Sequence, residues 1–258
     1  MEKEKEVLKV AILEVQSLTG GYTRKPVLQD VTFSIEKGEL IGLIGLNGAG
    51  KSTTIKHIIG LMQPQSGEIR LNGKTFAEDM DAYRSAFSYI PETPILYEEL
   101  TLREHLELTA MAYNIEPAAF EKRSAELLKE FRMEKRLKWF PSQFSKGMRQ
   151  KVMIMSAFLV KPSLYIIDEP FVGLDPLGIK SLLDQMESQK KKGASVLMST
   201  HILSTAERYC DRIILLHNGR VRAMGTMNDL RRTFGMPDAS LDDLYIAMTE
   251  DAANEELA

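Results

Sequence analysis

The sequence has almost no cysteine and no long hydrophobic run, and both absences narrow the class of protein. Its single cysteine, Cys210, cannot form a disulfide within the chain. The longest apolar runs, such as 152–160, fall well short of the ~20 residues that a membrane-spanning helix needs. The opening residues 1–6 are charged and lack the apolar core of a signal peptide. We therefore expect a cytosolic chain that does not cross a membrane by itself.

An excess of charge of one sign is also lacking. The chain has 33 basic and 36 acidic residues, a net charge of −3 and a pI near 5.9. This balance provides no broad electrostatic footprint for nucleic acid, so we expect none as a partner. No low-complexity linker or internal repeat interrupts the 258 residues, and 44% of them are hydrophobic. Such a chain can bury a sizeable core as one large domain or as a domain with a subdomain.

What the sequence does contain is a glycine-rich segment between an apolar stretch and a helix-like one. It reads Gly45-Leu46-Asn47-Gly48-Ala49-Gly50-Lys51-Ser52-Thr53, which fits the phosphate loop G-x-x-x-x-G-K-[ST]. Glycines let successive backbone N–H groups surround phosphate oxygens at a helix N-terminus. Lys51 would reach the β- and γ-phosphates, and the Ser52 hydroxyl would bind Mg²⁺. The alternative is a glycine-rich turn with a chance lysine.

Two carboxylates follow a second apolar segment. The expected strand 164–167 leads directly into Asp168 and Glu169, at the edge where α/β proteins bind ligands. In a phosphate-loop enzyme the first acid supports Mg²⁺, and the second orients or deprotonates an attacking water. The alternative is a strand end capped within a loop.

The rest of the chain reads as three regions. Short β segments are expected at 11–15 and 27–35, and Asn72-Gly73 predicts a hairpin-like turn. Residues 101–160 read as helical, opening on a Thr101/Glu104 capping box, with a further helix starting at Pro117. Alternating strands and helices then indicate a parallel sheet, with segments at 164–167, 176–192, 194–199 and 212–216.

The order of the motifs resembles ABC-transporter ATP-binding subunits over nearly the whole chain. It includes the glycine loop, Phe144-Ser145-Lys146-Gly147-Met148-Arg149-Gln150, Asp168-Glu169-Pro170, Gly173-Leu174-Asp175-Pro176 and His201. The resemblance implies an α/β fold: a P-loop NTPase core of the ABC-ATPase type, with an N-terminal antiparallel β subdomain and a helical signature subdomain. We expect the ATPase domain at 1–230, with the helical subdomain at about 88–160, and a helical tail at 231–258 whose acidic end, from Glu250, is disordered.

The same resemblance implies roles for individual residues around ATP. Tyr22 corresponds to the aromatic residue that stacks on adenine, or is a surface tyrosine in a turn. Asp168 closes the Walker B motif, and Glu169 polarises the hydrolytic water. His201 corresponds to the switch histidine that contacts the γ-phosphate, with an ordinary helix cap as the alternative.

A second set of residues is implied to act on the nucleotide of another subunit. Ser145 and Gly147 belong to the family signature and precede an expected helix, whose N–H groups would face the γ-phosphate. Asp175 would help to couple the two sites. Two chains, identical or paralogous, would then stack head to tail around two ATP molecules. A purely structural interpretation makes Ser145 a helix cap only.

The chain departs from the family pattern at two places. Glu92 stands where the family usually has glutamine, which puts a carboxylate that can accept Mg²⁺ near the triphosphate. Lys146 and Met148 interrupt a signature that is commonly glycine-rich. These variants resemble bacterial export-type systems, notably of the Ecs type.

Membership of that group implies an ATPase at the cytoplasmic face of the membrane. It would power substrate movement through a separate polytopic membrane subunit, which this chain does not itself supply. The rival hypotheses are a soluble assembly or regulatory ATPase, as in iron–sulfur cluster assembly or chromosome-associated proteins, and a binding switch with little hydrolysis. Only the partner separates transport from assembly.

Overall fold

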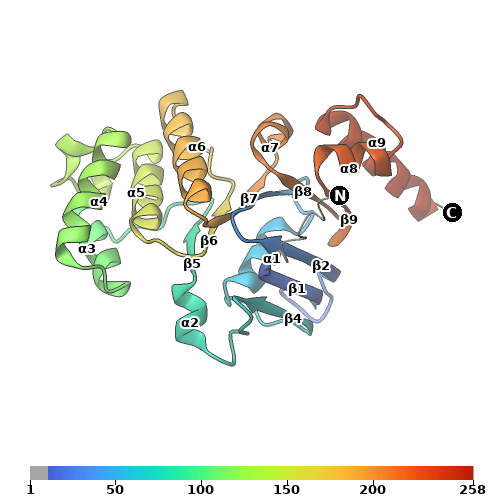
Figure 1. Cartoon of the computed structure of the whole chain (residues 1–258), viewed down its shortest axis with the longest axis horizontal. Helices are drawn as coiled ribbons and strands as arrows, with labels where there is room; N and C mark the ends of the chain where they lie inside the picture. The colour runs from blue at the N-terminus through green and yellow to red at the C-terminus, as the bar shows by residue number, and fades with distance from the viewer. Residues whose placement is uncertain (1–10, 258) are drawn as a thin grey trace, which may run out of the picture.

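The structure is a computed structural model that describes residues 11–257, with side chains described as far as Glu250 (Figure 1). The charged residues 1–6, on which the expectation about a signal peptide depends, lie outside the described residues. Among the helices that are described, none is both long enough and apolar enough to span a bilayer.

One sheet is antiparallel and confirms the expected N-terminal β subdomain. Its order is β2-β1-β4, with β1 at Ala11–Gly20, β2 at Leu28–Glu36 and β4 at Ser66–Leu71. Alternate residues of β2, including Val31, Phe33 and Ile35, are buried, as its alternating sequence indicates. The expected turn at Asn72-Gly73 follows β4, where Leu71 bridges to Lys74.

The other sheet is mixed and six-stranded, in the order β5-β6-β7-β3-β8-β9. All neighbouring pairs are parallel except β8 and β9. The strands are β3 (Leu40–Ile44), β5 (Phe87–Ile90), β6 (Leu164–Asp168), β7 (Ser195–Thr200), β8 (Arg212–His217) and β9 (Arg220–Gly225). Because β3, β5, β6 and β7 are parallel, the segments that follow them all leave from the same edge of the sheet.

Helices cover both faces of this sheet and extend beyond its β5 edge. The helices are α1 (Lys51–Ile58), α2 (Met80–Ser85), α3 (Leu102–Ala112), α4 (Pro117–Glu130), α5 (Lys146–Leu159), α6 (Pro176–Lys191), α7 (Leu203–Tyr209), α8 (Met227–Thr233) and α9 (Leu241–Leu257), with short 3₁₀ turns at Glu134–Arg136 and Pro141–Gln143. Figure 1 places α3, α4 and α5 together at one end of the molecule and α8 and α9 at the other.

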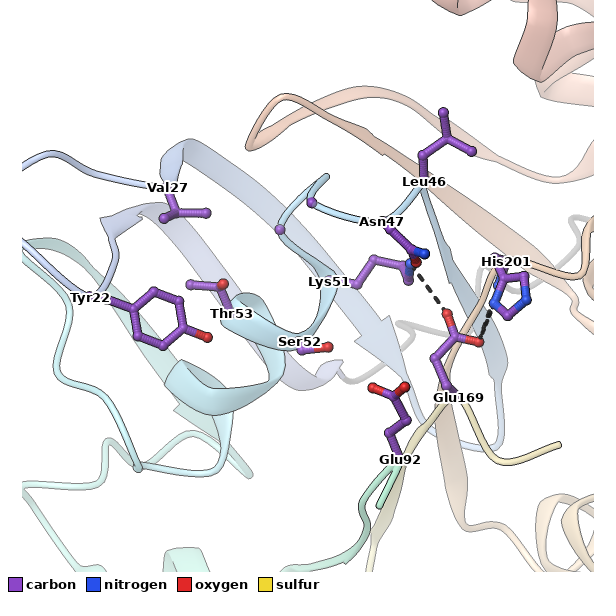
Figure 2. A pocket seen from close by; sticks show the side chains of 12 residues that line it. Tyr22, Val27, Leu46, Asn47, Lys51, Ser52, Thr53, Glu92, Glu169 and His201 are labelled. Atoms are coloured by element: carbon purple, nitrogen blue, oxygen red, sulfur yellow. Dashed lines mark hydrogen bonds and ion pairs between the residues drawn. The ribbon is translucent and has the colours of Figure 1, made fainter. Parts of the chain in front are cut away.

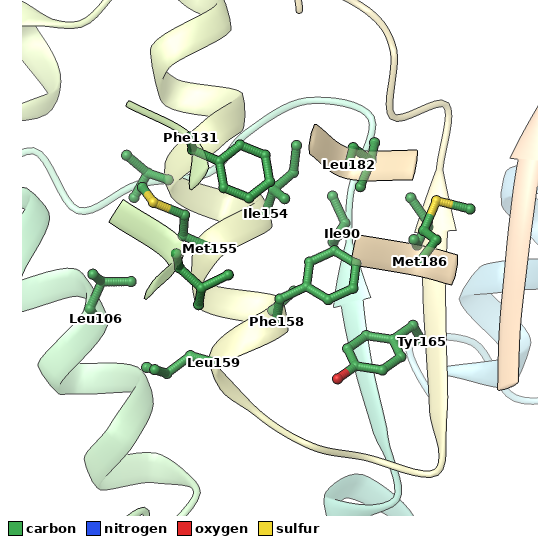
Figure 3. Close-up of a cluster of buried hydrophobic side chains, with 14 of the residues drawn as sticks. Ile90, Leu106, Phe131, Ile154, Met155, Phe158, Leu159, Tyr165, Leu182 and Met186 are labelled. Atoms are coloured by element: carbon green, nitrogen blue, oxygen red, sulfur yellow. The ribbon is translucent and has the colours of Figure 1, made fainter. Parts of the chain in front are cut away.

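Three buried clusters hold these layers together. The first joins α3, α4, α5 and α6 to β5 and β6, and Figure 3 shows it around Phe158 and Tyr165, whose stacked rings are 4.8 Å apart. The second lies between the two sheets and includes Ile55 and Ile58 of α1. The third packs α8 and α9 against Ile44 and the outer strands. Burial of these apolar side chains is the main favourable contribution to folding.

The helix starts predicted from sequence occur where expected. Thr101 and Glu104 form the reciprocal capping box of α3, and Pro117 is the first residue of α4. The strand and helix bounds add detail to the expected subdomains. Residues 88–90 belong to β5, because they pair with β6 in the central sheet, so the helical part begins at α3. Helix α9 spans Leu241–Leu257 within the expected C-terminal helical tail.

Candidate nucleotide site

A cleft of about 480 Å³ opens at the edge where β3, β5, β6 and β7 end (Figure 2). It is lined by residues from distant parts of the chain that the sequence predicts for a nucleotide site, together with Val27 and Leu46. The predicted residues that line it are Tyr22, Asn47, Gly48, Gly50, Lys51, Ser52, Thr53, Glu92, Glu169 and His201. Five separate segments of the chain therefore meet in one place.

The glycine loop connects β3 to α1, in the predicted strand, loop, helix order. Gly48 and Gly50 have φ angles of 86° and 110°, which side chains disfavour. At Gly45, a Cβ atom would lie 2.5 Å from the carbonyl oxygen of Leu216. Gly45 and the buried Ala49 do not line the cleft, and they lie on the side of the loop that faces away from it. The loop leaves backbone N–H groups at the start of α1 as an anion site.

The Lys51 amine is buried at the base of the loop. Its Nζ atom donates to the carbonyl oxygen of Gly45 at 2.7 Å and lies 3.2 Å from Oε1 of Glu169. Only 6% of the lysine is exposed, so solvent screens this ion pair weakly. A phosphate group entering the cleft would meet a positive charge that is already held in position.

The two carboxylates at the end of β6 are held by the neighbouring strand β7. Ser199 donates from its hydroxyl to Oδ1 of Asp168 at 2.5 Å and accepts from the backbone N–H of Glu169 at 3.0 Å. Glu169 has a φ of +46°, a conformation that costs free energy for a residue other than glycine. The backbone turn directs the two adjacent acids differently: Glu169 lines the cleft, and Asp168 lies behind it. Ser199 was not selected from the sequence, because only strand pairing brings it to Asp168.

His201 points at Glu169 rather than capping a helix. Its Nδ1 atom is 2.8 Å from Oε2 of Glu169, and its backbone N–H donates to the same oxygen at 3.3 Å. The N-cap of α7 is Ile202, so the helix-cap alternative for His201 is not what the structure has. Figure 2 shows Glu169 between Lys51 and His201, and one carboxylate contacts both.

Tyr22 lies at the other end of the cleft, near Thr53 (Figure 2). It is 61% exposed, as a stacking platform or a surface tyrosine can be. Lys56 donates to the Tyr22 hydroxyl at 3.0 Å, and its Nζ atom lies 5.0 Å from the ring centre. The hydrogen bond from Lys56 lowers the pKa of Tyr22 below its usual value. The cleft thus has an open aromatic end and a buried charged end.

Oxygen donors that suit Mg²⁺ lie between these ends. The Ser52 hydroxyl is 3.4 Å from Oδ1 of Asp168, and Glu92 lines the cleft from the segment after β5. Within the described residues, no three His, Cys, Asp or Glu side chains gather into a metal cage. Mg²⁺ is usually bound by one or two protein oxygens together with substrate phosphates and water, so this donor set fits it.

The residues expected to serve a second subunit lie elsewhere on the same chain. Ser145 caps α5 by accepting from the N–H of Met148 at 3.3 Å, and Asp175 caps α6 by accepting from Gly178 at 3.1 Å. Lys151 pairs with Asp175 at 2.9 Å and lowers the pKa of that carboxyl. Ser145, Gly147 and Asp175 are not among the described residues that line the cleft.

Fold and site together define the class of protein. A phosphate loop between a central strand and a helix, with a buried lysine and paired acids at the end of another parallel strand of the same sheet, is the arrangement of a P-loop nucleoside triphosphatase. Similarity to known proteins shows which family of P-loop nucleoside triphosphatases the chain belongs to.

The profile of the ABC transporter family matches residues 28–172. The chain is 68% identical to the ABC-type transporter ATP-binding protein EcsA of Bacillus subtilis (strain 168), over 96% of this chain and 100% of the relative. It is 45% identical to an uncharacterized ABC transporter ATP-binding protein, YthP, of the same organism, over 91% of this chain and 95% of the relative. The chain therefore belongs to the ABC transporter family, as an ATP-binding subunit.

Solved structures agree with this assignment. The structure of an ATP-binding subunit of an ABC transporter has 63% identity and a TM-score of 0.90, over 92% of this chain and 99% of the other. The ATP-binding cassette MJ0796, a dimer in a post-hydrolysis state bound to ADP and Pi, has 24% identity and a TM-score of 0.76, over 83% of this chain and 98% of the other. At that identity the second likeness concerns the fold alone. The predicted fold and family are confirmed.

Proposed function

We propose that this chain binds and hydrolyses ATP at the described cleft, as the peripheral subunit of an exporter on the cytoplasmic face of the membrane. The observation that carries the proposal is the buried Glu169 carboxylate, which contacts both Lys51 and His201 beside the phosphate loop. The chemistry follows from this arrangement. Lys51 and the loop N–H groups bind phosphate oxygens, and Tyr22 supports the base.

Glu169 then orients and deprotonates the attacking water. When phosphates draw Lys51 away, Glu169 is freed to accept a proton from water while His201 remains bonded to its other oxygen. His201 thereby holds the carboxylate in position and brings a donor close to the γ-phosphate. Ser52, Asp168 and Glu92 would hold Mg²⁺, which supplies charge neutralisation on the phosphates.

A second subunit, another copy or a paralogue, completes the site. Ser145 and Gly147 form the start of α5, whose N–H groups and positive dipole end suit a γ-phosphate. Because these groups do not line their own chain's cleft, they remain available to the nucleotide of a partner. The dimer of MJ0796, a cassette with the same fold, supports the proposal of a dimer. Asp175 would couple the two sites.

The segment after β5 suits transmission to a membrane subunit. Glu92 lines the cleft, while Ile95 and Tyr97 nearby in sequence are 77% and 62% exposed. Glu98 pairs with Arg149 of α5 at 2.8 Å, so the same segment is tied to the helical part. A movement at the nucleotide would therefore reach both an exposed apolar surface and the signature helix.

Glu92 provides a direct test of this transmission. We expect Glu92→Ala to uncouple ATP hydrolysis from its membrane partner, because the side chain that senses the metal is lost. Glu92→Gln retains an oxygen at that position and should retain coupling. The measurement is ATPase activity with and without the reconstituted partner. Full partner-dependent activity in the Ala variant would contradict the role assigned to Glu92.

Affinity capture tests the proposal as a whole. We would tag the chain, solubilise its native membranes in mild detergent, and identify co-purifying proteins by mass spectrometry, in ATP, for wild type and Glu169→Gln. The expected result is a multi-span membrane protein, captured more completely with the variant because the ATP-bound dimer persists. Recovery of soluble partners only would contradict transport and favour an assembly ATPase.

A further inference from the structure

The C-terminal helix makes a direct contact with the phosphate loop. The hydroxyl of Tyr245, in α9, accepts a hydrogen bond from the backbone N–H of Leu46 at 2.8 Å. The two residues are 199 positions apart, and Tyr245 is only 5% exposed. Tyr245 itself does not line the cleft, so it acts on the loop from behind.

This hydrogen bond belongs to a set that fixes the Leu46 peptide on both sides. The carbonyl oxygen of Leu46 accepts from the N–H of Ala49 at 3.0 Å, and the carbonyl oxygen of Gly45 accepts from Lys51. The Leu46 side chain is 57% exposed, so packing does little to hold this residue. The position of the first turn of the loop therefore depends on hydrogen bonds, one of which comes from the tail.

Helix α9 is itself firmly anchored. The Tyr245 ring packs in a buried cluster with Ile44, the last residue of β3, and with Ala206 of α7. At its start, the N–H of Leu241 donates to Oε2 of Glu207 at 3.0 Å, and Glu207 pairs with Arg231 of α8 at 3.4 Å. Burial raises the pKa of Tyr245, so its hydroxyl stays neutral at ordinary pH. Tyr245 can thus act as a rigid support.

We propose that Tyr245 is a positioning residue that holds the phosphate loop in its nucleotide-binding conformation before ATP arrives. The inference depends on the proposed ATP site and adds to it a contribution from the C-terminal helix. A loop fixed in advance loses less conformational entropy on binding, which raises affinity without any new contact to the ligand. At saturating ATP the phosphates hold the loop themselves, so the chemical step changes little.

The test removes one oxygen atom. Tyr245→Phe keeps the buried ring but leaves the Leu46 N–H without its acceptor. Loss of one hydrogen bond changes an equilibrium constant by about tenfold at most. We therefore expect the Kd for a fluorescent ATP analogue to rise about three- to tenfold. The KM for ATP should rise in parallel, with kcat within about twofold of wild type. Hydrogen exchange at the Leu46 amide should also become faster.

Tyr165→Phe is the matched control. The Tyr165 hydroxyl is also buried and donates one hydrogen bond, to the carbonyl oxygen of Val160 at 2.9 Å, and Tyr165 belongs to the first buried cluster and does not line the cleft. Both variants should lose a similar amount of thermal stability, but only Tyr245→Phe should lose affinity. A second variant, Glu207→Ala, releases the start of α9 and should raise the Kd in the same direction.

The outcomes separate the two proposals. Equal ATP affinity in wild type and Tyr245→Phe, with stability reduced as in the control, would make Tyr245 an anchor for the tail only and overturn this inference. A fall in kcat at unchanged KM would overturn it as well. No binding of ATP by the wild-type chain would overturn the proposed function and this inference together.

Discussion

Glu169→Gln is expected to bind ATP about as well as wild type while hydrolysing it about 10²–10⁴-fold more slowly. The amide keeps the size of the side chain and an oxygen near His201, but it cannot accept a proton from water. It also removes the negative charge 3.2 Å from Lys51, which leaves the lysine free for phosphate. The variant should therefore accumulate as a closed, ATP-bound dimer.

Single-turnover hydrolysis and size-exclusion chromatography in ATP would measure both effects. Glu187→Gln is a suitable control, because Glu187 pairs with Lys191 on the exposed part of α6 and does not line the cleft. Its turnover and dimerisation should match wild type. Normal turnover by Glu169→Gln, in a preparation free of other ATPases, would exclude Glu169 as the base.

Lys51→Met is expected to weaken ATP binding by about 10- to 100-fold and to abolish measurable turnover. Charge-assisted hydrogen bonds to phosphate each contribute about 1.5–3 kcal/mol, and Met supplies neither the charge nor the donors. The change also leaves the buried Glu169 without its cationic neighbour, so an anionic ligand would meet an uncompensated negative charge. The fall in affinity should thus exceed that from any other single lysine.

Equilibrium titration with a fluorescent ATP analogue would measure this loss. Lys191→Ala removes an exposed lysine from α6 and should leave the Kd unchanged. An unaltered Kd in Lys51→Met would mean that the nucleotide phosphates do not bind at the glycine loop. Circular dichroism would establish that both variants fold, since Lys51 is a buried residue of α1.

Much of the fold could be predicted because the determining interactions are local. The capping box at Thr101 and the helix start at Pro117 depend on residues within one turn, and both occur as predicted. The glycine loop was recognised because its backbone conformation requires glycine at fixed spacing. Residues 88–90 were harder to assign, since a short strand buried in a parallel sheet has no periodic pattern of its own.

The phosphate loop, the paired acids and the order of motifs that places the chain in its family follow from the sequence alone, because each of these is a short-range pattern. The groups that support them follow from the tertiary structure instead. Parallel pairing of β6 and β7 brings Ser199 to Asp168 and Glu169, and packing of α9 brings Tyr245 to Leu46. Contacts between residues far apart in the chain depend on strand order and core packing, which no local pattern encodes.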